Sequence, residues 1–217
     1  MFRDGKGGRM FDGLIRGVID PPMNRGGRWL AARGASANAV TLVGLGLGLV
    51  ASALIALGQA GAIVILFLLG GRLADGLDGA VARTRGKTAF GGLLDIVCDF
   101  VFYAAFPLAF VWQDPAANGV AGAFLLASFY VNSATFLGYA ILAAQRGMET
   151  RVHGEKSLYF TAGLMEGAET IAAFVLIAAL PDLFVPLALG FGALCLVTAG
   201  ARLTLAWRVF QEPAAPQ

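Results

Sequence analysis

Two neighbouring apolar segments of this sequence carry aspartates at helical spacing. Asp75 and Asp78 are three residues apart, and Asp95 and Asp99 are four residues apart, so each pair shares one face of a helix. An ionised aspartate costs about 2.5–3.5 kcal/mol at the centre of a membrane helix on insertion scales. Because four such groups stay ionised close together only beside a cation, and oxygen ligands favour Mg²⁺, Mn²⁺ or Ca²⁺ over zinc, the pattern predicts a divalent-metal site.

A metal held by carboxylates suits chemistry on a diphosphate, because the metal bridges phosphate oxygens and neutralises charge in the transition state. Gly79 and Ala82 extend the face of Asp75 and Asp78, and their small size would let a nucleotide approach the helix backbone. A remaining carboxylate could take the proton of an attacking hydroxyl. Arg72 lies one turn before Asp75, and we expect it to pair with the acidic cluster.

The rest of the sequence indicates a membrane protein. Of its 217 residues, 58% are hydrophobic and 14% are charged, against about 25% charged residues in an average soluble domain. A bilayer core about 30 Å thick needs about 20 apolar residues in a helix. The sequence contains six apolar segments of about this length, which are too long and continuous to be the strands of a membrane β-barrel. We expect an all-α integral membrane protein with six transmembrane helices, at about 37–57, 61–82, 90–112, 119–144, 158–180 and 184–207.

The positions of the cations predict how these segments are oriented. Lys and Arg precede the first segment and follow the second and fourth, whereas the opposite loops contain none. By the positive-inside rule both termini are cytoplasmic, which requires an even number of spans. The net charge of +2 is too small to indicate nucleic-acid binding, and Cys98 and Cys195 are interpreted as small hydrophobic side chains in apolar stretches.

The N-terminal region is predicted to lie on the membrane surface. Residues 10–20 place apolar side chains at helical spacing among charged ones, and Pro21-Pro22 ends the pattern, which is typical of an interfacial amphipathic helix. A cleavable secretory signal peptide would place its apolar run close to the N-terminus, whereas the first long apolar run here starts near residue 37. We therefore expect no cleavable signal peptide. The chain then divides into a cytoplasmic N-terminal segment with the interfacial helix (1–35), a six-helix membrane domain (36–210) and a cytoplasmic tail (211–217).

The aspartates belong to a longer pattern, D-x2-D-G-x2-A-R-x7-G-x3-D-x3-D. This pattern resembles the signature of the CDP-alcohol phosphatidyltransferase family, and the six spans and surface helix resemble the family's architecture, so the resemblance covers most of the chain. The loop before the second glycine is slightly shorter than in many members, and Ser36-Ala37-Asn38 stands where members often have Ser-Pro-Asn. All eight signature positions are filled: Asp75, Asp78, Gly79, Ala82, Arg83, Gly91, Asp95 and Asp99.

The resemblance implies transfer of a phosphatidyl group from CDP-diacylglycerol, or a similar CDP-linked lipid, to an alcohol acceptor with release of CMP. It implies phospholipid biosynthesis in a bacterial inner membrane, and it allows a homodimer. It also implies two ions of Mg²⁺ or Mn²⁺, with Asp75, Asp78 and Asp95 as metal ligands and Asp99 as both a ligand of the second metal and the general base. Contacts to the nucleotide are implied for Gly79, Ala82, Arg83, Gly91, Asn38 and Thr41.

The motif does not specify the acceptor. Lys156 and Arg202 are interpreted as anchors for a polar or phosphorylated alcohol, such as glycerol 3-phosphate or inositol phosphate, because a charge within the last apolar segment needs a reason. Glu166 and Glu169 stay unassigned. Two alternatives are an intramembrane metal-dependent prenyltransferase, which would usually carry more spans and separated acidic motifs, and a cation-coupled transporter, which would often show internal repeats.

Overall fold

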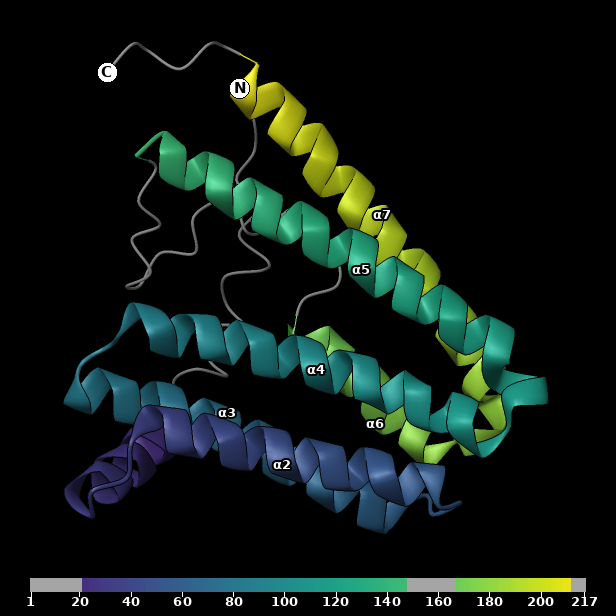
Figure 1. The fold of residues 1–217 in the computed structure, drawn as a ribbon, viewed down its shortest axis with the longest axis horizontal. Coiled ribbons are helices and arrows are strands. Elements are labelled where there is room, and N and C mark those ends of the chain that lie inside the picture. The colour runs from purple at the N-terminus through teal and green to yellow at the C-terminus, as the bar shows by residue number, and fades with distance from the viewer. Residues whose placement is uncertain (1–20, 148–166, 212–217) are drawn as a thin grey trace, which may run out of the picture. The chain divides into compact units, whose positions relative to one another are not determined.

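Every element in the described part of the chain is helical. The computed structural model describes residues 21–147 and 167–211. The described part of α6 covers Gly167–Ala179, and a 3-10 turn, η1 (Pro181–Leu183), follows it. The predicted all-α fold is confirmed. The long helices in Figure 1 are α2 (Ala37–Ala56), α3 (Ala62–Arg85), α4 (Ala89–Gln113), α5 (Pro115–Gln145) and α7 (Phe184–Phe210).

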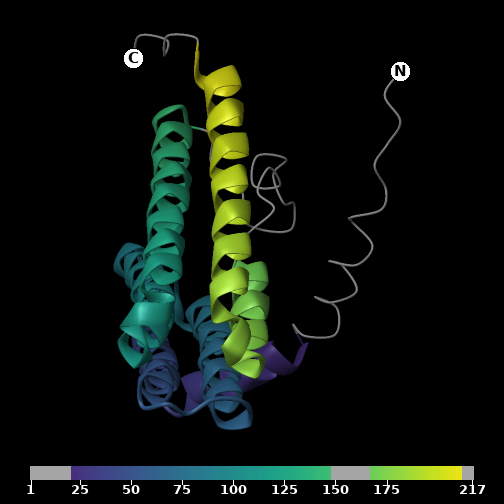
Figure 2. The same cartoon turned by 90° about the vertical axis from the view of Figure 1, so that its right-hand side faces the viewer.

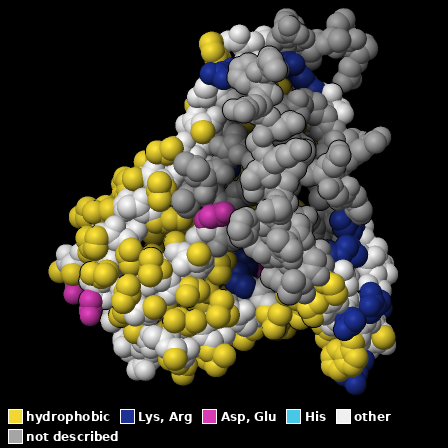
Figure 3. All heavy atoms as spheres, turned by 180° about the vertical axis from the view of Figure 1, so that it is seen from behind, with side chains coloured by type: hydrophobic (Ala, Val, Ile, Leu, Met, Phe, Trp, Pro, Cys, Tyr) yellow, Lys and Arg dark blue, Asp and Glu magenta, His cyan; other side chains and the backbone are white. Residues whose placement is uncertain are grey.

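Four stretches within the described residues are long and apolar enough to cross a membrane. They are Ala37–Ala56, Ala89–Gln113, Pro115–Gln145 and Pro181–Phe210. In α3 the apolar sequence is interrupted by one arginine and two aspartates. Many large apolar side chains are exposed, as Figure 3 shows for one face, and apolar surface of this extent is typical of contact with lipid. The chain is therefore a membrane protein; the interfacial helix predicted over 10–20 lies outside the described residues.

The chain divides into two compact units. Among the described residues, the first contains 21–51 and 66–102, and we call it the aspartate unit. The second, which we call the aromatic unit, contains 52–65, 103–147 and 167–211. Each unit has its own buried core.

Small residues bring the helices of the aspartate unit close together. A Cβ atom added at Gly71 of α3 would lie only 3.0 Å from the carbonyl oxygen of Gly44 on α2, so the two backbones are nearly in contact. A short connection joins α3 to α4 as antiparallel neighbours (Figure 1), and within it Gly86 has a φ of 103°, which favours glycine. The two aspartate-bearing segments are thus held face to face.

Residues 21–32 form a further helical segment, which the sequence analysis did not predict. Pro21-Pro22 was interpreted as the end of a helical pattern, but both prolines are helical in the structure. The segment packs on α3 so closely that a Cβ atom added at Gly27 would overlap the side chain of Ala80. It therefore adds a fourth helical piece beside the aspartates.

The start of α5 lies earlier than the predicted residue 119. Pro115 occupies the first turn, and the side chain of Asp114 accepts a hydrogen bond of 3.0 Å from the backbone N–H of Ala117. Aspartate is a favoured N-cap and proline a favoured first residue, so these two residues, which lie between the predicted spans 90–112 and 119–144, start the next helix.

Stacked aromatic rings form the core of the aromatic unit. Phe106 of α4 stacks on Phe174 of α6 with ring centroids 4.0 Å apart, and Phe110 of α4 stacks on Phe184 of α7 at 4.5 Å. Helix α5 packs along α7, as Figures 1 and 2 show. Aromatic ring pairs add about 0.5–1.5 kcal/mol each beyond the area that they bury. The two ring pairs join α4 to α6 and α7, and the packing of α5 on α7 adds the fourth helix.

Replacing Gly71 with valine is expected to destabilise the aspartate unit, because the new side chain would meet the backbone of α2 at Gly44. Such overpacking costs about 1–3 kcal/mol, which thermal unfolding of the purified protein in detergent would reveal. Gly46→Val is the matched control, since nothing lies within 4 Å of a Cβ atom added at Gly46. Equal unfolding temperatures for the two variants would contradict the close packing of α2 on α3.

Candidate functional site

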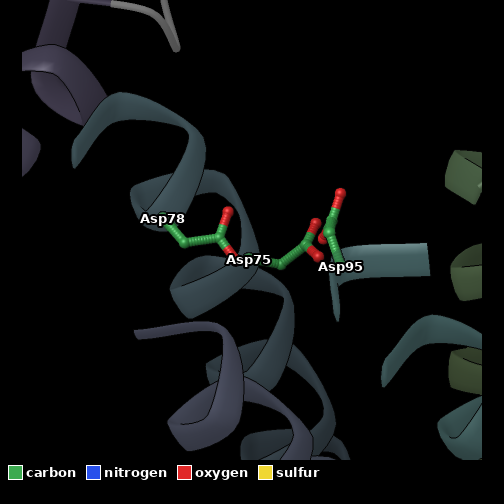
Figure 4. Close-up of side chains that lie close together, drawn as sticks. All are labelled: Asp75, Asp78 and Asp95. Atoms are coloured by element: carbon green, nitrogen blue, oxygen red, sulfur yellow. The ribbon is translucent and has the colours of Figure 1, made fainter. Parts of the chain in front are cut away.

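Three aspartates from two helices meet in the aspartate unit. Asp75 and Asp78 come from α3 and Asp95 from α4, and one carboxylate oxygen of each lies within 4.8 Å of the others. Figure 4 shows that the carboxylates of Asp75 and Asp95 lie next to each other, with Asp78 one turn further along α3. At about 3.6 residues per turn, the three aspartates lie roughly two to three helical turns from the α3–α4 connection. Three oxygen donors at this separation fit a hard divalent cation such as Mg²⁺ or Mn²⁺.

Thr41 of α2 holds one member of this trio. Its hydroxyl donates a hydrogen bond of 2.6 Å to Oδ2 of Asp78, which is buried. Such short bonds to a carboxylate are about twice as strong as bonds between neutral groups. The sequence analysis predicted a nucleotide contact for Thr41; the structure places its hydroxyl on Asp78, where it orients a predicted metal ligand.

Asp99 joins the cluster through a cation. Nη2 of Arg72 lies 2.9 Å from Oδ1 of Asp75 and 3.0 Å from Oδ1 of Asp99. The prediction that Arg72 pairs with the acidic cluster is confirmed. Asp99 is not among the three carboxylates whose oxygens gather together, but it shares Nη2 of Arg72 with Asp75.

The remaining signature residues of α3 lie beyond the aspartates, toward the end of the helix. Gly79 follows Asp78 directly, and Ala82 is half-buried one turn later. Arg83 donates a hydrogen bond of 2.9 Å to the side chain of Asn24, which lies in the helical segment 21–32. Sequence reasoning missed Asn24 because it falls outside the signature and no local pattern marks it.

Gly91, at the start of α4, lies against α2. A Cβ atom added there would come within 3.2 Å of Oδ1 of Asn38 and 3.0 Å of Oγ1 of Thr88. The structure therefore brings together two of the predicted nucleotide-binding residues, Asn38 and Gly91, from separate helices. Both lie in the aspartate unit with the carboxylates.

Arg202 belongs to the aromatic unit, and α5 holds its guanidinium. Its Nη1 donates to the backbone oxygen of Asn132 at 3.1 Å, to the side-chain oxygen of Asn132 at 3.0 Å and to Oγ1 of Thr135 at 3.1 Å. Glu169 lies in the first described turn of α6. Lys156 and Glu166 lie outside the described residues.

Comparison with known proteins agrees with this fold and site. Residues 35–209 match the CDP-alcohol phosphatidyltransferase family, which is most of the chain. The chain therefore belongs to this family and is an enzyme of that class, a membrane-bound CDP-alcohol phosphatidyltransferase. This membership decides against the prenyltransferase and the transporter.

The chain is also similar to individual proteins and solved structures. The chain is 41% identical to the inner membrane protein YnjF of Escherichia coli K12 over 89% of its own length and 94% of that protein's. It is 38% identical to archaetidylinositol phosphate synthase of Pyrococcus horikoshii, over 39% of this chain and 45% of that one. The fold is similar to that of Mycobacterium tuberculosis phosphatidylinositol phosphate synthase with CDP-DAG bound, with a TM-score of 0.64 and 24% identity over 89% of this chain and 98% of that one.

Replacing Thr41 with valine, which has nearly the same shape, is expected to weaken Mn²⁺ binding about tenfold, because partners that orient metal ligands typically contribute 10–100-fold to affinity. Calorimetric titration of the purified protein with Mn²⁺ measures this change. Thr204→Val is the control, since the Thr204 hydroxyl contacts only the Gly200 carbonyl of its own helix among the hydrogen bonds of the described residues. Unchanged affinity in Thr41→Val would show that its hydroxyl does not position Asp78.

Proposed function

We propose that this enzyme transfers a phosphatidyl group from CDP-diacylglycerol, or a similar CDP-linked lipid, to an alcohol and releases CMP, as a step of phospholipid biosynthesis in a bacterial inner membrane. The convergence of Asp75, Asp78 and Asp95 inside the family's signature carries the proposal. The CDP-DAG bound to the mycobacterial neighbour and the name of the Escherichia coli relative support the donor and the location.

In this proposal residues 36–210 form a domain of six transmembrane helices with both termini in the cytoplasm. The predicted segments 61–82 and 158–180, to which α3 and the described part of α6 belong, cross the membrane together with the four apolar stretches. The alternation of cations between the loops supports this topology. A homodimer is part of the proposal, because exposed glycines such as Gly46 permit close helix packing.

We assign two divalent ions, Mg²⁺ or Mn²⁺, to the aspartates. Asp75, Asp78 and Asp95 hold the first, and Asp99 contributes to the second. The manganese present in a second structure of the mycobacterial neighbour (TM-score 0.62, 23% identity over 90% of this chain and 92% of that one) supports the choice. Bound ions of this kind neutralise the diphosphate and the charge that develops as CMP departs.

The transfer forms one phosphorus–oxygen bond and breaks another. The acceptor hydroxyl attacks the phosphorus that bears the lipid, and the bond from this phosphorus to the bridging oxygen of the diphosphate breaks, so CMP leaves with that oxygen. Asp99 accepts the proton of the hydroxyl. The cytidine contacts are assigned to Gly79, Ala82, Arg83, Gly91, Asn38 and Thr41.

For the acceptor we propose a phosphorylated alcohol bound by Arg202 and Lys156. The guanidinium of Arg202 has the planar donor geometry that suits phosphate, and three hydrogen bonds from α5 fix its direction. Two of the relatives are named as synthases of inositol phosphate lipids, which supports inositol phosphate as the first acceptor to test.

The purified enzyme with Mg²⁺ or Mn²⁺ is expected to release CMP from CDP-diacylglycerol when it is given the right acceptor, and removal of metal by EDTA should stop the release. The measurement is CMP formation across glycerol 3-phosphate, serine, inositol, inositol phosphate and phosphatidylglycerol. Turnover with an unphosphorylated alcohol alone would contradict the acceptor proposal and leave the donor proposal standing. No CMP with any of these acceptors would contradict both.

Asp99→Asn is expected to lower the rate of CMP release by at least about 10²-fold, since general bases contribute about 10²–10⁴-fold, while nucleotide binding persists. Release of CMP and binding of CDP to the same preparation measure the two effects. Asp114→Asn is the matched control, because asparagine caps a helix about as well as aspartate and Asp114 caps α5. Full activity of Asp99→Asn would remove Asp99 as the base.

A further inference from the structure

Arg72 places a positive charge inside α3, on the same face as the aspartates. Its side chain is only 22% exposed, so it lies largely away from water. One nitrogen, Nη2, contacts Asp75 and Asp99 together, and these come from different helices. The guanidinium also lies 5.9 Å from the ring centroid of Phe102 on α4, within the range of a cation–π contact. Arg72 thus connects α3 to α4 through the cluster itself.

The two carboxylates that Arg72 bridges are also carboxylates to which the proposed function assigns metal. Asp75 belongs to the trio whose oxygens gather, and Asp99 is assigned to the second ion. A guanidinium and a metal ion are both cations, so each neutralises the same anionic charge and each weakens the binding of the other. Of the four carboxylates, all of them in the described part of the chain, Asp75 and Asp99 are the two within ion-pair distance of Arg72. The competition is largest for the ion assigned to Asp99, because the first ion keeps Asp78 and Asp95 as ligands.

A small cavity lies beside the guanidinium of Arg72. Gly44, Gly48 and Gly71 line a cavity of about 10 Å³ next to Arg72, Asp75 and Asp99, which is close to the volume one water needs. The ring of Phe102 lines the same cavity. The cation–π contact with Phe102 involves neither carboxylate, so it can persist when metal takes a carboxylate from Arg72.

We propose that Arg72 is a resident counter-cation: it stabilises the acidic cluster when no metal is bound, and it lowers the affinity of the cluster for divalent metal, most of all at Asp99. Arg72 is a positioning residue that acts through Asp75 and Asp99. The proposal rests on the metal-binding part of the proposed function. Under this proposal the second ion binds more weakly than the first, because the second ion must displace Arg72 from Asp99.

The test compares the full-length wild type with Arg72→Gln in detergent, by thermal unfolding in EDTA and in Mn²⁺ and by calorimetric titration with Mn²⁺. In EDTA the variant should unfold about 2–8 °C lower, because its carboxylates have lost their cation. Its Mn²⁺ affinity should rise about tenfold, the lower end of what one charge does at this distance, and Mn²⁺ should raise its unfolding temperature more than that of the wild type.

Arg85→Gln is the matched control for loss of one positive charge on α3. Arg85 donates hydrogen bonds of 2.8 Å to the carbonyl oxygens of Gly34 and Ala35, away from the aspartates. This variant should lower the unfolding temperature equally in EDTA and in Mn²⁺ and leave the Mn²⁺ affinity unchanged. The same result for Arg72→Gln would mean that Arg72 is only a structural ion pair, and would overturn the proposal.

The double variant Arg72→Gln/Asp99→Asn removes the cation together with its carboxylate partner. In EDTA it should recover most of the stability lost in Arg72→Gln, and it should fold even if the single variant does not. Failure of both variants to fold, or no recovery in the double variant, would overturn the proposal. If the wild type binds Mn²⁺ and Arg72→Gln binds it no more tightly, this inference alone fails. If the wild type binds no divalent metal, the metal part of the proposed function fails with it.

Discussion

The repulsion between carboxylates held in two apolar helices is the constraint on which the aspartate unit depends. Water cannot screen these charges as it does at an open surface, so each carboxylate needs a donor or a cation from the protein or from bound metal. The structure supplies a donor to Asp78 from Thr41 and a cation to Asp75 and Asp99 from Arg72. The cluster is therefore partly compensated by its own chain, and the trio of oxygens is left facing one another where a metal would fit.

Close backbone packing is what lets these partners reach the carboxylates. The Thr41 hydroxyl meets Asp78 only because α2 lies against α3, and Gly44 and Gly71 allow that approach. Gly91 likewise allows α4 to approach α2 closely, at the side chain of Asn38. Glycine in these helices gives up side-chain packing and helix propensity, so its presence at the contact points trades local stability for the geometry of the site.

The sequence alone predicted those features of the site that depend on local spacing. The pairing of aspartates at three and four residues follows from the helical repeat, and the contact of Arg72 with Asp75 follows from the same rule. The bond from Thr41 to Asp78 joins residues 37 positions apart, so it depends on how α2 packs and no local pattern reveals it. The helical segment 21–32 was missed for the opposite reason, because Pro21-Pro22 is a local signal that fits either end of a helix.

The donor and acceptor halves of the proposed reaction draw on different units of the chain. All contacts described for the aspartates are made within the aspartate unit, whereas Arg202 is held by Asn132 and Thr135 in the aromatic unit. Three hydrogen bonds restrict the guanidinium before any acceptor arrives, which reduces the entropy lost on binding but also fixes the direction from which a phosphate can be bound. In the proposed acceptor site, the choice of acceptor would therefore depend on the α5 residues that hold Arg202, and these residues make none of the contacts described for the carboxylates.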